Sequence, residues 1–162
     1  MKRLLSLFLP MRFKDSMQSF DKGLEAYEKG IYSTALNIWT PLAQKGDSNA
    51  QNGLGLISLN GEGSLKNDEV ALQWFRLAAE QGHPNAQVTL GLFYKYGKGV
   101  PRNHKVAEKW CTLAAEQGNA LAQVVLGGMY VSEDGWGVHR DYKAALKWFR
   151  LAAIQGCPRA RW

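Results

Sequence analysis

A nine-residue phrase occurs three times along the chain, and this repetition constrains the fold more than any other feature of the sequence. It reads WFRLAAEQG, then WCTLAAEQG, then WFRLAAIQG, and the three copies end at Gly82, Gly118 and Gly156. Gly46 closes a fourth, more divergent segment, so the intervals are 36, 36 and 38 residues. Such periods are typical of helical arrays in which each repeat buries its apolar face on its neighbours. The pattern therefore predicts a stack of equivalent helical units.

The phrase belongs to the second of two helices predicted in each repeat. Ala71, Trp74 and Ala78 follow the spacing of one helical face. Each helix is predicted to begin after an N-cap residue and to end at a glycine in the left-handed conformation. The predicted N-caps are Asn67, Asn103 and Asp141. We interpret the tryptophan as a packing knob and the alanine pair as its hole, with Cys111 as a smaller packing residue rather than a nucleophile.

The first helix of each repeat contains a glycine directly after a leucine, at Gly55, Gly91 and Gly127. Glycine inside a helix costs about 1 kcal/mol relative to alanine, so we expect another helix to approach closely there. A turn follows, and the two extra residues of the last repeat lie within it, in YVSEDGWGVHRD. The segment GKGV at 97–100 is predicted to be turn rather than phosphate loop, because the sequence lacks G-x-x-x-x-G-K-[ST] there.

The period divides the chain into six segments. A leader at 1–15 begins with two cations and a short apolar run, which is too short to span a bilayer. A secretory signal is the alternative interpretation of that run. The remaining segments are a divergent tetratricopeptide-like helix pair, three repeats and the start of a further repeat, at 16–46, 47–82, 83–118, 119–156 and 157–162. The last repeat is expected either to precede a missing continuation or to dock a partner on its uncovered end.

These motifs resemble the Sel-one-like repeat family, a relative of the tetratricopeptide repeats. Residues 86–100 match the pattern A-x-x-x-L-G-x-x-Y-x-x-G-x-G-V, and 141–156 match D-x-x-K-A-x-x-W followed by A-A-x-x-G. The resemblance covers about residues 16–160, and repeat 2 departs from it with Ser58 in place of tyrosine. It implies an all-α fold, an α/α superhelical solenoid of stacked antiparallel helix pairs. The cysteine-rich form with a disulfide in each repeat is not supported, because the chain has only Cys111 and Cys157.

The resemblance also implies where a partner would bind. In related repeats the first helices line the concave face, and we expect partner-binding positions beside the repeated residues of those helices. They are Asn49, Asn52, Leu56, Asn85, Val88, Leu92, Lys95, Leu121, Val124 and Val131. Amides mixed with aliphatic side chains suit a peptide or a partner helix. Only Lys95 among them is a cation, so a clamp for a terminal carboxylate is not predicted. The alternative is that some of these aliphatic residues belong to the core between repeats.

No catalytic, metal-binding or cofactor-binding residue is predicted. His83, His104 and His139 fall in turns or at helix starts, and the chain has no H-E-x-x-H or G-x-S-x-G motif. Glu133 and Asp134 are interpreted as solvated charges in the inserted turn. The net charge of +6 is spread along the chain, so no nucleic-acid partner is expected.

The predicted function is a non-catalytic, bacterial-type scaffold or adaptor that binds a partner protein or peptide. Two alternatives stay open: a cell-wall-related enzyme or ligand-binding protein like the penicillin-interacting cysteine-rich relatives, and a partner-specific chaperone or immunity protein. We expect a cytoplasmic location without a transmembrane segment. A periplasmic or secreted location is the alternative if the N-terminal apolar run acts as a signal.

Overall fold

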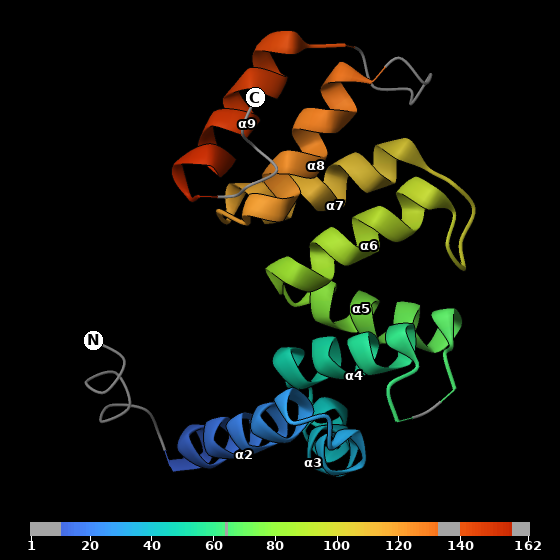
Figure 1. Cartoon of the computed structure of the whole chain (residues 1–162), viewed down its shortest axis with the longest axis vertical. Helices are drawn as coiled ribbons and strands as arrows, with labels where there is room; N and C mark the ends of the chain where they lie inside the picture. Colours follow the sequence, from blue (N-terminus) through green and yellow to red (C-terminus); the bar gives the residue numbers. More distant parts are fainter. Residues whose placement is uncertain (1–10, 64, 133–139, 157–162) are drawn as a thin grey trace. The chain divides into compact units, whose positions relative to one another are not determined.

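The computed structural model describes residues 11–63, 65–132 and 140–156, with side chains from Met17 onward. Over these residues the structure is entirely helical, as predicted, and contains no strand. The helices are α2 (Met11–Glu28), α3 (Tyr32–Gln44), α4 (Ser48–Asn60), α5 (Asp68–Glu80), α6 (Pro84–Tyr96), α7 (His104–Glu116), α8 (Ala120–Val131) and α9 (Tyr142–Ile154) (Figure 1). None of these described helices is long and apolar enough to cross a lipid bilayer.

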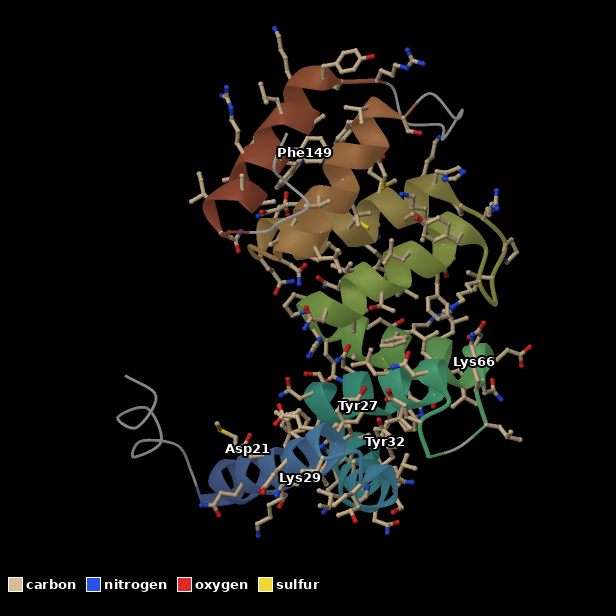
Figure 2. All side chains as sticks on the ribbon, in the orientation of Figure 1. Asp21, Tyr27, Lys29, Tyr32, Lys66 and Phe149 are labelled. Atoms are coloured by element: carbon tan, nitrogen blue, oxygen red, sulfur yellow. The ribbon has the colours of Figure 1, made fainter. Side chains whose placement is uncertain are left out.

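The chain divides into two compact units, Met1–Ala71 and Leu72–Trp162, and the boundary falls within α5. In the first unit α3 packs on α2 and on α4. The indole of Trp39 is 2% exposed and stacks on Phe20, with 5.5 Å between the ring centroids. Tyr27 and Tyr32, labelled in Figure 2, extend this aromatic cluster through an edge-on contact at 5.5 Å. A Cβ atom at Gly23 or Gly53 would overlap the indole, so both neighbouring helices carry glycine where Trp39 lies.

In the second unit α6 packs on α7, α7 on α8, and α8 on α9. A Cβ atom at Gly91 would lie 2.6 Å from Sγ of Cys111, and one at Gly127 would lie 2.6 Å from the ring of Phe149. Phe149 is labelled in Figure 2. The close helix approach predicted at these two glycines is therefore confirmed. Cys111 is 1% exposed, which confirms its interpretation as a packing residue.

The helix ends follow the predicted chemistry. The side chains of Asn103 and Asp141 accept hydrogen bonds from the backbone N–H groups of Val106 and Ala144, at 3.1 and 2.9 Å. Asn67 likewise accepts from the N–H of Val70 at 3.0 Å. The predicted helix-ending glycines all have positive φ, and those angles are 94°, 87°, 86° and 74° at Gly46, Gly82, Gly118 and Gly156. All three predicted N-caps and all four predicted glycine stops are thus confirmed.

Two expectations about the helices differ from the structure. Helix α2 begins at Met11, within the segment 1–15 expected as a leader. The buried knobs are Phe75, Cys111 and Phe149, whereas the tryptophan that precedes each of them is only partly buried. The reason is that Cys111 and Phe149 point at the first helix of their own repeat, whereas Phe75 packs edge-on against Phe93 of α6. Gly91 and Gly127 leave room for two of these side chains.

Three parts of the sequence lie outside the described residues, at 1–10, 133–139 and 157–162, together with residue 64. The first includes most of the predicted leader. The second includes Glu133, Asp134, Trp136 and His139 of the inserted turn. The third includes Cys157 and the start of the expected further repeat.

Candidate functional site

The first helices of the three repeats share four buried residues and differ at most positions that reach the surface. One further buried position also varies, as Ile57, Phe93 and Met129. Four positions are the same in every copy, and all twelve residues are buried. They are Ala50, Gln51, Leu54 and Gly55 in α4, Ala86, Gln87, Leu90 and Gly91 in α6, and Ala122, Gln123, Leu126 and Gly127 in α8. Identity at these positions is therefore explained by packing. A binding function must be sought at the positions that vary.

The positions predicted to bind a partner are mostly accessible. Asn49, Asn85 and Leu121 are exposed. The partly buried positions are Asn52, Leu56, Leu92, Lys95, Val124 and Val131. Of these, Leu92 packs against the core cluster of α7 and α8, so the alternative of an inter-repeat core residue applies in part to it.

Val88 differs from its expectation. It is 1% exposed and belongs to the core cluster of the second unit, together with residues of α7 and α8. Its counterparts Asn52 and Val124 are only partly buried. The expected exposure of Val88 is therefore wrong, because the neighbouring helices close over this side chain. A binding role for the other positions stays a prediction.

The polar groups at these positions offer hydrogen-bonding capacity on both units. In the first unit, Oδ1 of Asn52 is buried and accepts no hydrogen bond from the described part of the chain. In the second, Oδ1 of Asn85 accepts a hydrogen bond from Nδ2 of Asn119 at 2.7 Å. Nζ of Lys95 lies 5.2 Å from the ring centroid of Tyr96, within cation–π range. A buried amide oxygen without a donor is costly unless a ligand or water supplies one.

Two titratable side chains of the second unit, Cys111 and His83, serve structure. Burial raises the pKa of the Cys111 thiol to about 12, so the thiol stays protonated at neutral pH. Nδ1 of His83 accepts a hydrogen bond from the N–H of Ala86 at 3.3 Å and thereby caps α6. His104 is the first residue of α7. Within the described residues, no three His, Cys, Asp or Glu side chains are grouped so that they could hold a metal ion.

Two functional features were missed from the sequence. One is a set of three buried glutamines, Gln51, Gln87 and Gln123, whose amides bond to the end of the preceding helix. The signal for it was present, because an Ala-Gln pair and a Gln-Gly pair recur with the same period. The other is the outward surface of α9, which carries cations and apolar side chains together. Arg150 and Leu151 of that surface belong to the repeated phrase itself, so the sequence contains no separate signal for it.

Packed pairs of short helices, joined by capped turns and repeated with a constant packing unit, define an α/α helical-repeat protein. Its three main repeats match the Sel1 repeat model, at residues 48–83, 84–119 and 120–157. These matches cover more than half of the chain, which therefore belongs to the Sel1 repeat family. Sel1 repeat proteins commonly mediate protein–protein interactions, and their fold is generally a non-enzymatic scaffold.

Solved structures of bacterial proteins show the same solenoid fold. A Sel1 repeat protein from Oxalobacter formigenes is 39% identical, with a TM-score of 0.80 over 88% of this chain and 56% of its own. A protective antigen of uropathogenic Escherichia coli strains, which displays an SLR fold, is 30% identical, with a TM-score of 0.77 over 90% of this chain and 32% of its own.

Cysteine rich protein B of Helicobacter pylori is 22% identical, with a TM-score of 0.56 over 91% of this chain and 92% of its own. It shares the fold alone. The present chain thus spans about half of the first relative and about a third of the second. The comparison with curated proteins gives no match.

Proposed function

We propose that this chain is a non-catalytic scaffold that binds a partner protein or peptide through the first helices of its repeats. The observation that carries the proposal is that α4, α6 and α8 keep four buried positions identical in every copy, whereas their accessible positions mostly vary. A surface that only faced solvent would need no particular aliphatic residues. Yet Leu121 is 42% exposed beside partly exposed Val124.

The chemistry of the surface suits a polypeptide. The exposed amide side chains of Asn49 and Asn85 can form hydrogen bonds with the backbone of a partner. The aliphatic positions of α8 offer apolar contact of the kind that receives alternate side chains of a peptide. Lys95 adds one positive charge on α6, which favours a partner segment with a nearby carboxylate.

The test is affinity capture with the tagged full chain, followed by mass spectrometry of the bound proteins. The test variant combines Lys95→Glu with Leu121→Asp. Leu92 is left unchanged, because it packs against the core. The control is Leu113→Asp on α7, since Leu113 is 38% exposed but lies on a second helix. We expect the test variant to lose a captured protein that the wild type and the control retain.

The proposal fails if the double variant and the wild type capture the same proteins in equal amounts. Circular dichroism of each variant must show wild-type helicity and melting for the comparison to count. Once a partner is identified, Asn49→Ala provides a second test. It should weaken binding by about tenfold if the exposed amide forms a hydrogen bond with the partner.

A further inference from the structure

The division of the chain into two units also divides its charge. Residues 1–71 contain eight Lys and Arg residues and eight Asp and Glu residues, whereas residues 72–162 contain twelve and six. The net charge of +6 therefore belongs to the second unit, in contrast to the even spread expected from the sequence.

The second unit has its longest stretch without negative charge around the turn between α6 and α7 (Figure 1). Residues 81–107 contain no Asp or Glu. We name residues 95–105 the cationic turn, because they include the end of α6, the turn itself and the start of α7 together with four cations. These cations are Lys95, Lys98, Arg102 and Lys105.

Two of the cations gather at Tyr96, the last residue of α6. The Nε group of Arg102 donates a hydrogen bond to the Tyr96 carbonyl at 3.3 Å, and Nζ of Lys95 lies 5.2 Å from the centroid of the Tyr96 ring. Arg102 lies over the helix end because Gly97 has no side chain, since a Cβ atom there would lie 2.8 Å from Cγ of Arg102. Tyr96 is 57% exposed. The turn thus presents an accessible aromatic ring with two cations beside it.

The equivalent turn of repeat 2 has the same backbone features. It contains Gly61 and Gly63, with φ angles of 75° and 72°. The cationic turn contains Gly97 and Gly99, with φ angles of 72° and 66°. The two turns can therefore be compared position by position, at an offset of 36 residues.

The side chains of the two turns differ in the sign of their charge. Repeat 2 has glutamates at the places of Lys98 and Lys105, which are Glu62 and Glu69, and it has asparagine at the place of Tyr96. The repeat fold thus accepts acidic and polar residues at these positions. Packing within the repeat does not explain why the cationic turn carries lysines and an exposed tyrosine.

Helix stability does not explain Lys105 either. Lys105 is the second residue of α7, where the partial positive charge of the helix N-terminus favours a carboxylate. Helix α5 has Asp68 and Glu69 in its first turn, whereas α7 has no acidic residue there. A cation at this place opposes the helix by about 0.3–1 kcal/mol. Lys95 differs, because it lies in the last turn of α6, where a cation is favourable.

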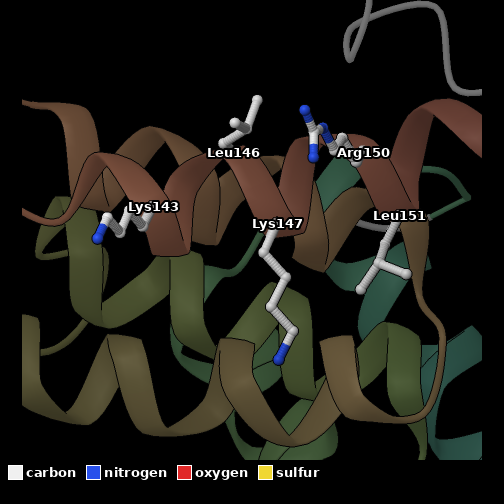
Figure 3. A pocket seen from close by; sticks show the side chains of 5 residues that line it. All are labelled: Lys143, Leu146, Lys147, Arg150 and Leu151. Carbon is white, nitrogen blue, oxygen red and sulfur yellow. The ribbon is translucent and has the colours of Figure 1, made fainter.

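The last repeat keeps part of the same charge. Arg140 and Lys143 stand at the places of Arg102 and Lys105, and all four side chains are exposed. Figure 3 shows Lys143 and Lys147 on the same side of α9. The positive potential of the second unit therefore extends beyond the cationic turn, and it attracts a negatively charged partner from a distance.

We propose that the cationic turn binds an acidic, extended segment of a partner protein, and that Tyr96 contacts an apolar side chain of that segment. This inference rests on the proposed scaffold function and names the chemistry of the partner. Opposite charge across an interface gives specificity, and tyrosine and arginine are among the residues that contribute most to binding. A nucleic acid fits less well, because the turn offers four cations, whereas strong binding to a duplex uses about 6–10 phosphate contacts.

The test measures binding of the full chain to fluorescein-labelled peptides by fluorescence anisotropy. The acidic peptide has one phenylalanine between two runs of glutamate, and the matched neutral peptide has glutamine in place of every glutamate. We expect the acidic peptide to bind with a Kd below about 100 μM at low salt, and the neutral one at least about tenfold more weakly. Added salt should weaken binding of the acidic peptide, because it screens exposed charges.

The test variant combines Lys98→Glu with Lys105→Glu. It introduces the glutamates that repeat 2 has at the same places, so the fold should tolerate it, and it should weaken binding of the acidic peptide by at least about tenfold. The control combines Lys22→Glu with Lys45→Glu, two exposed lysines of the first unit. It changes the net charge equally and should change the Kd less than about twofold. Tyr96→Asn, again a residue taken from repeat 2, should weaken binding by at least about threefold.

Absent binding to the wild type, equal binding of the two peptides, or equal losses in the test and control variants would overturn the proposal. Single-stranded DNA with the same label would also overturn it by binding more tightly than the acidic peptide and losing that binding in the test variant, because a nucleic acid would then be the occupant. The acidic peptide can also fail while the wild type still captures a protein that the variant with Lys95→Glu and Leu121→Asp loses. In that case only the partner chemistry assigned to the cationic turn falls, and the scaffold function stands.

Discussion

Gln117 donates its side-chain amide to Oε1 of Gln87 at 2.8 Å, although thirty residues separate them in the chain. The Nε2 group of Gln87 in turn donates to the carbonyl of Ala79 at 3.2 Å, at the end of the preceding helix. That carbonyl also accepts the N–H of Gly82 at 2.9 Å. One buried glutamine thus uses its donor and its acceptor to join three helix ends. The next repeat does the same, since Gln155 donates to Gln123 at 3.0 Å.

Replacing Gln87 with leucine should destabilise the protein although it adds apolar volume. Gln87 is 3% exposed, so the change removes the buried hydrogen bond to the carbonyl of Ala79 and the partly buried one from Gln117. We expect the free energy of unfolding to fall by about 1–3 kcal/mol, measured by urea denaturation. Gln117→Ala is the control, and because Gln117 is exposed its effect should stay within about 0.5 kcal/mol. Equal stability of Gln87→Leu and wild type would contradict this role.

Features set by chemistry within a few residues could be predicted from the sequence. Asn103 caps α7 because its side chain reaches an N–H three residues ahead, and that requires no knowledge of the rest of the fold. Gly118 ends the same helix with a φ of 86°, which the absence of a side chain permits. Even the close helix approach at Gly91 could be predicted. Glycine weakens a helix, so its recurrence at one position indicates that the missing side chain makes room for a neighbouring helix.

Features set by how helices pack could not be predicted in the same way. Val88 and Val124 are the same residue type at equivalent positions, yet only Val88 is fully buried. Their burial depends on which neighbouring helix lies over each one, and the helical period does not contain that information. For the same reason Phe149 rather than Trp148 fills the space at Gly127.

Two glycines in the second unit should respond oppositely to alanine. At Gly91 an added Cβ would lie 2.6 Å from Sγ of Cys111 and 3.2 Å from the carbonyl oxygen of Ala107. Helices α6 and α7 must then separate, and we expect Gly91→Ala to lower the unfolding free energy by about 1–3 kcal/mol. At Gly128 nothing lies within 4 Å, so Gly128→Ala should raise it by about 0.5–1 kcal/mol through better helix propensity. Destabilisation of similar size by both changes would show that helix approach is not the cause.

The Cys111 thiol should be unreactive in the folded protein. Burial raises its pKa to about 12, and the nearby charge of Lys95 opposes this only in part. In a Cys157→Ser variant, Ellman's reagent at pH 8 should react slowly with the native chain and rapidly in urea, because only the exposed thiolate attacks. Fast reaction without denaturant would contradict the packing role.

The raised pKa of Cys111 also predicts a direction for stability at alkaline pH. The folded state favours the protonated thiol, so its contribution is fully present below about pH 9 and is lost as the pH rises toward 12. Cys111→Ala should remove this part of the alkaline loss of stability. Thermal melting of the variant and the wild type at several pH values checks it. If the melting temperature falls equally with pH in the variant and the wild type, other groups cause the loss of stability.

Tyr130 and Glu108 should be coupled energetically. The Tyr130 hydroxyl donates to Oε1 of Glu108 at 2.7 Å, and burial together with this carboxylate raises the pKa of Tyr130 to about 12. Tyr130→Phe and Glu108→Leu should each lower the unfolding free energy by about 1–2 kcal/mol, since each leaves the other partner without its hydrogen bond. The double variant has an apolar pair at this place. We expect the double variant to lose less unfolding free energy than the sum of the two single losses. The coupling energy in a double-mutant cycle should be about 1 kcal/mol. Strict additivity would show that the hydrogen bond contributes nothing to the packing of α8 on α7.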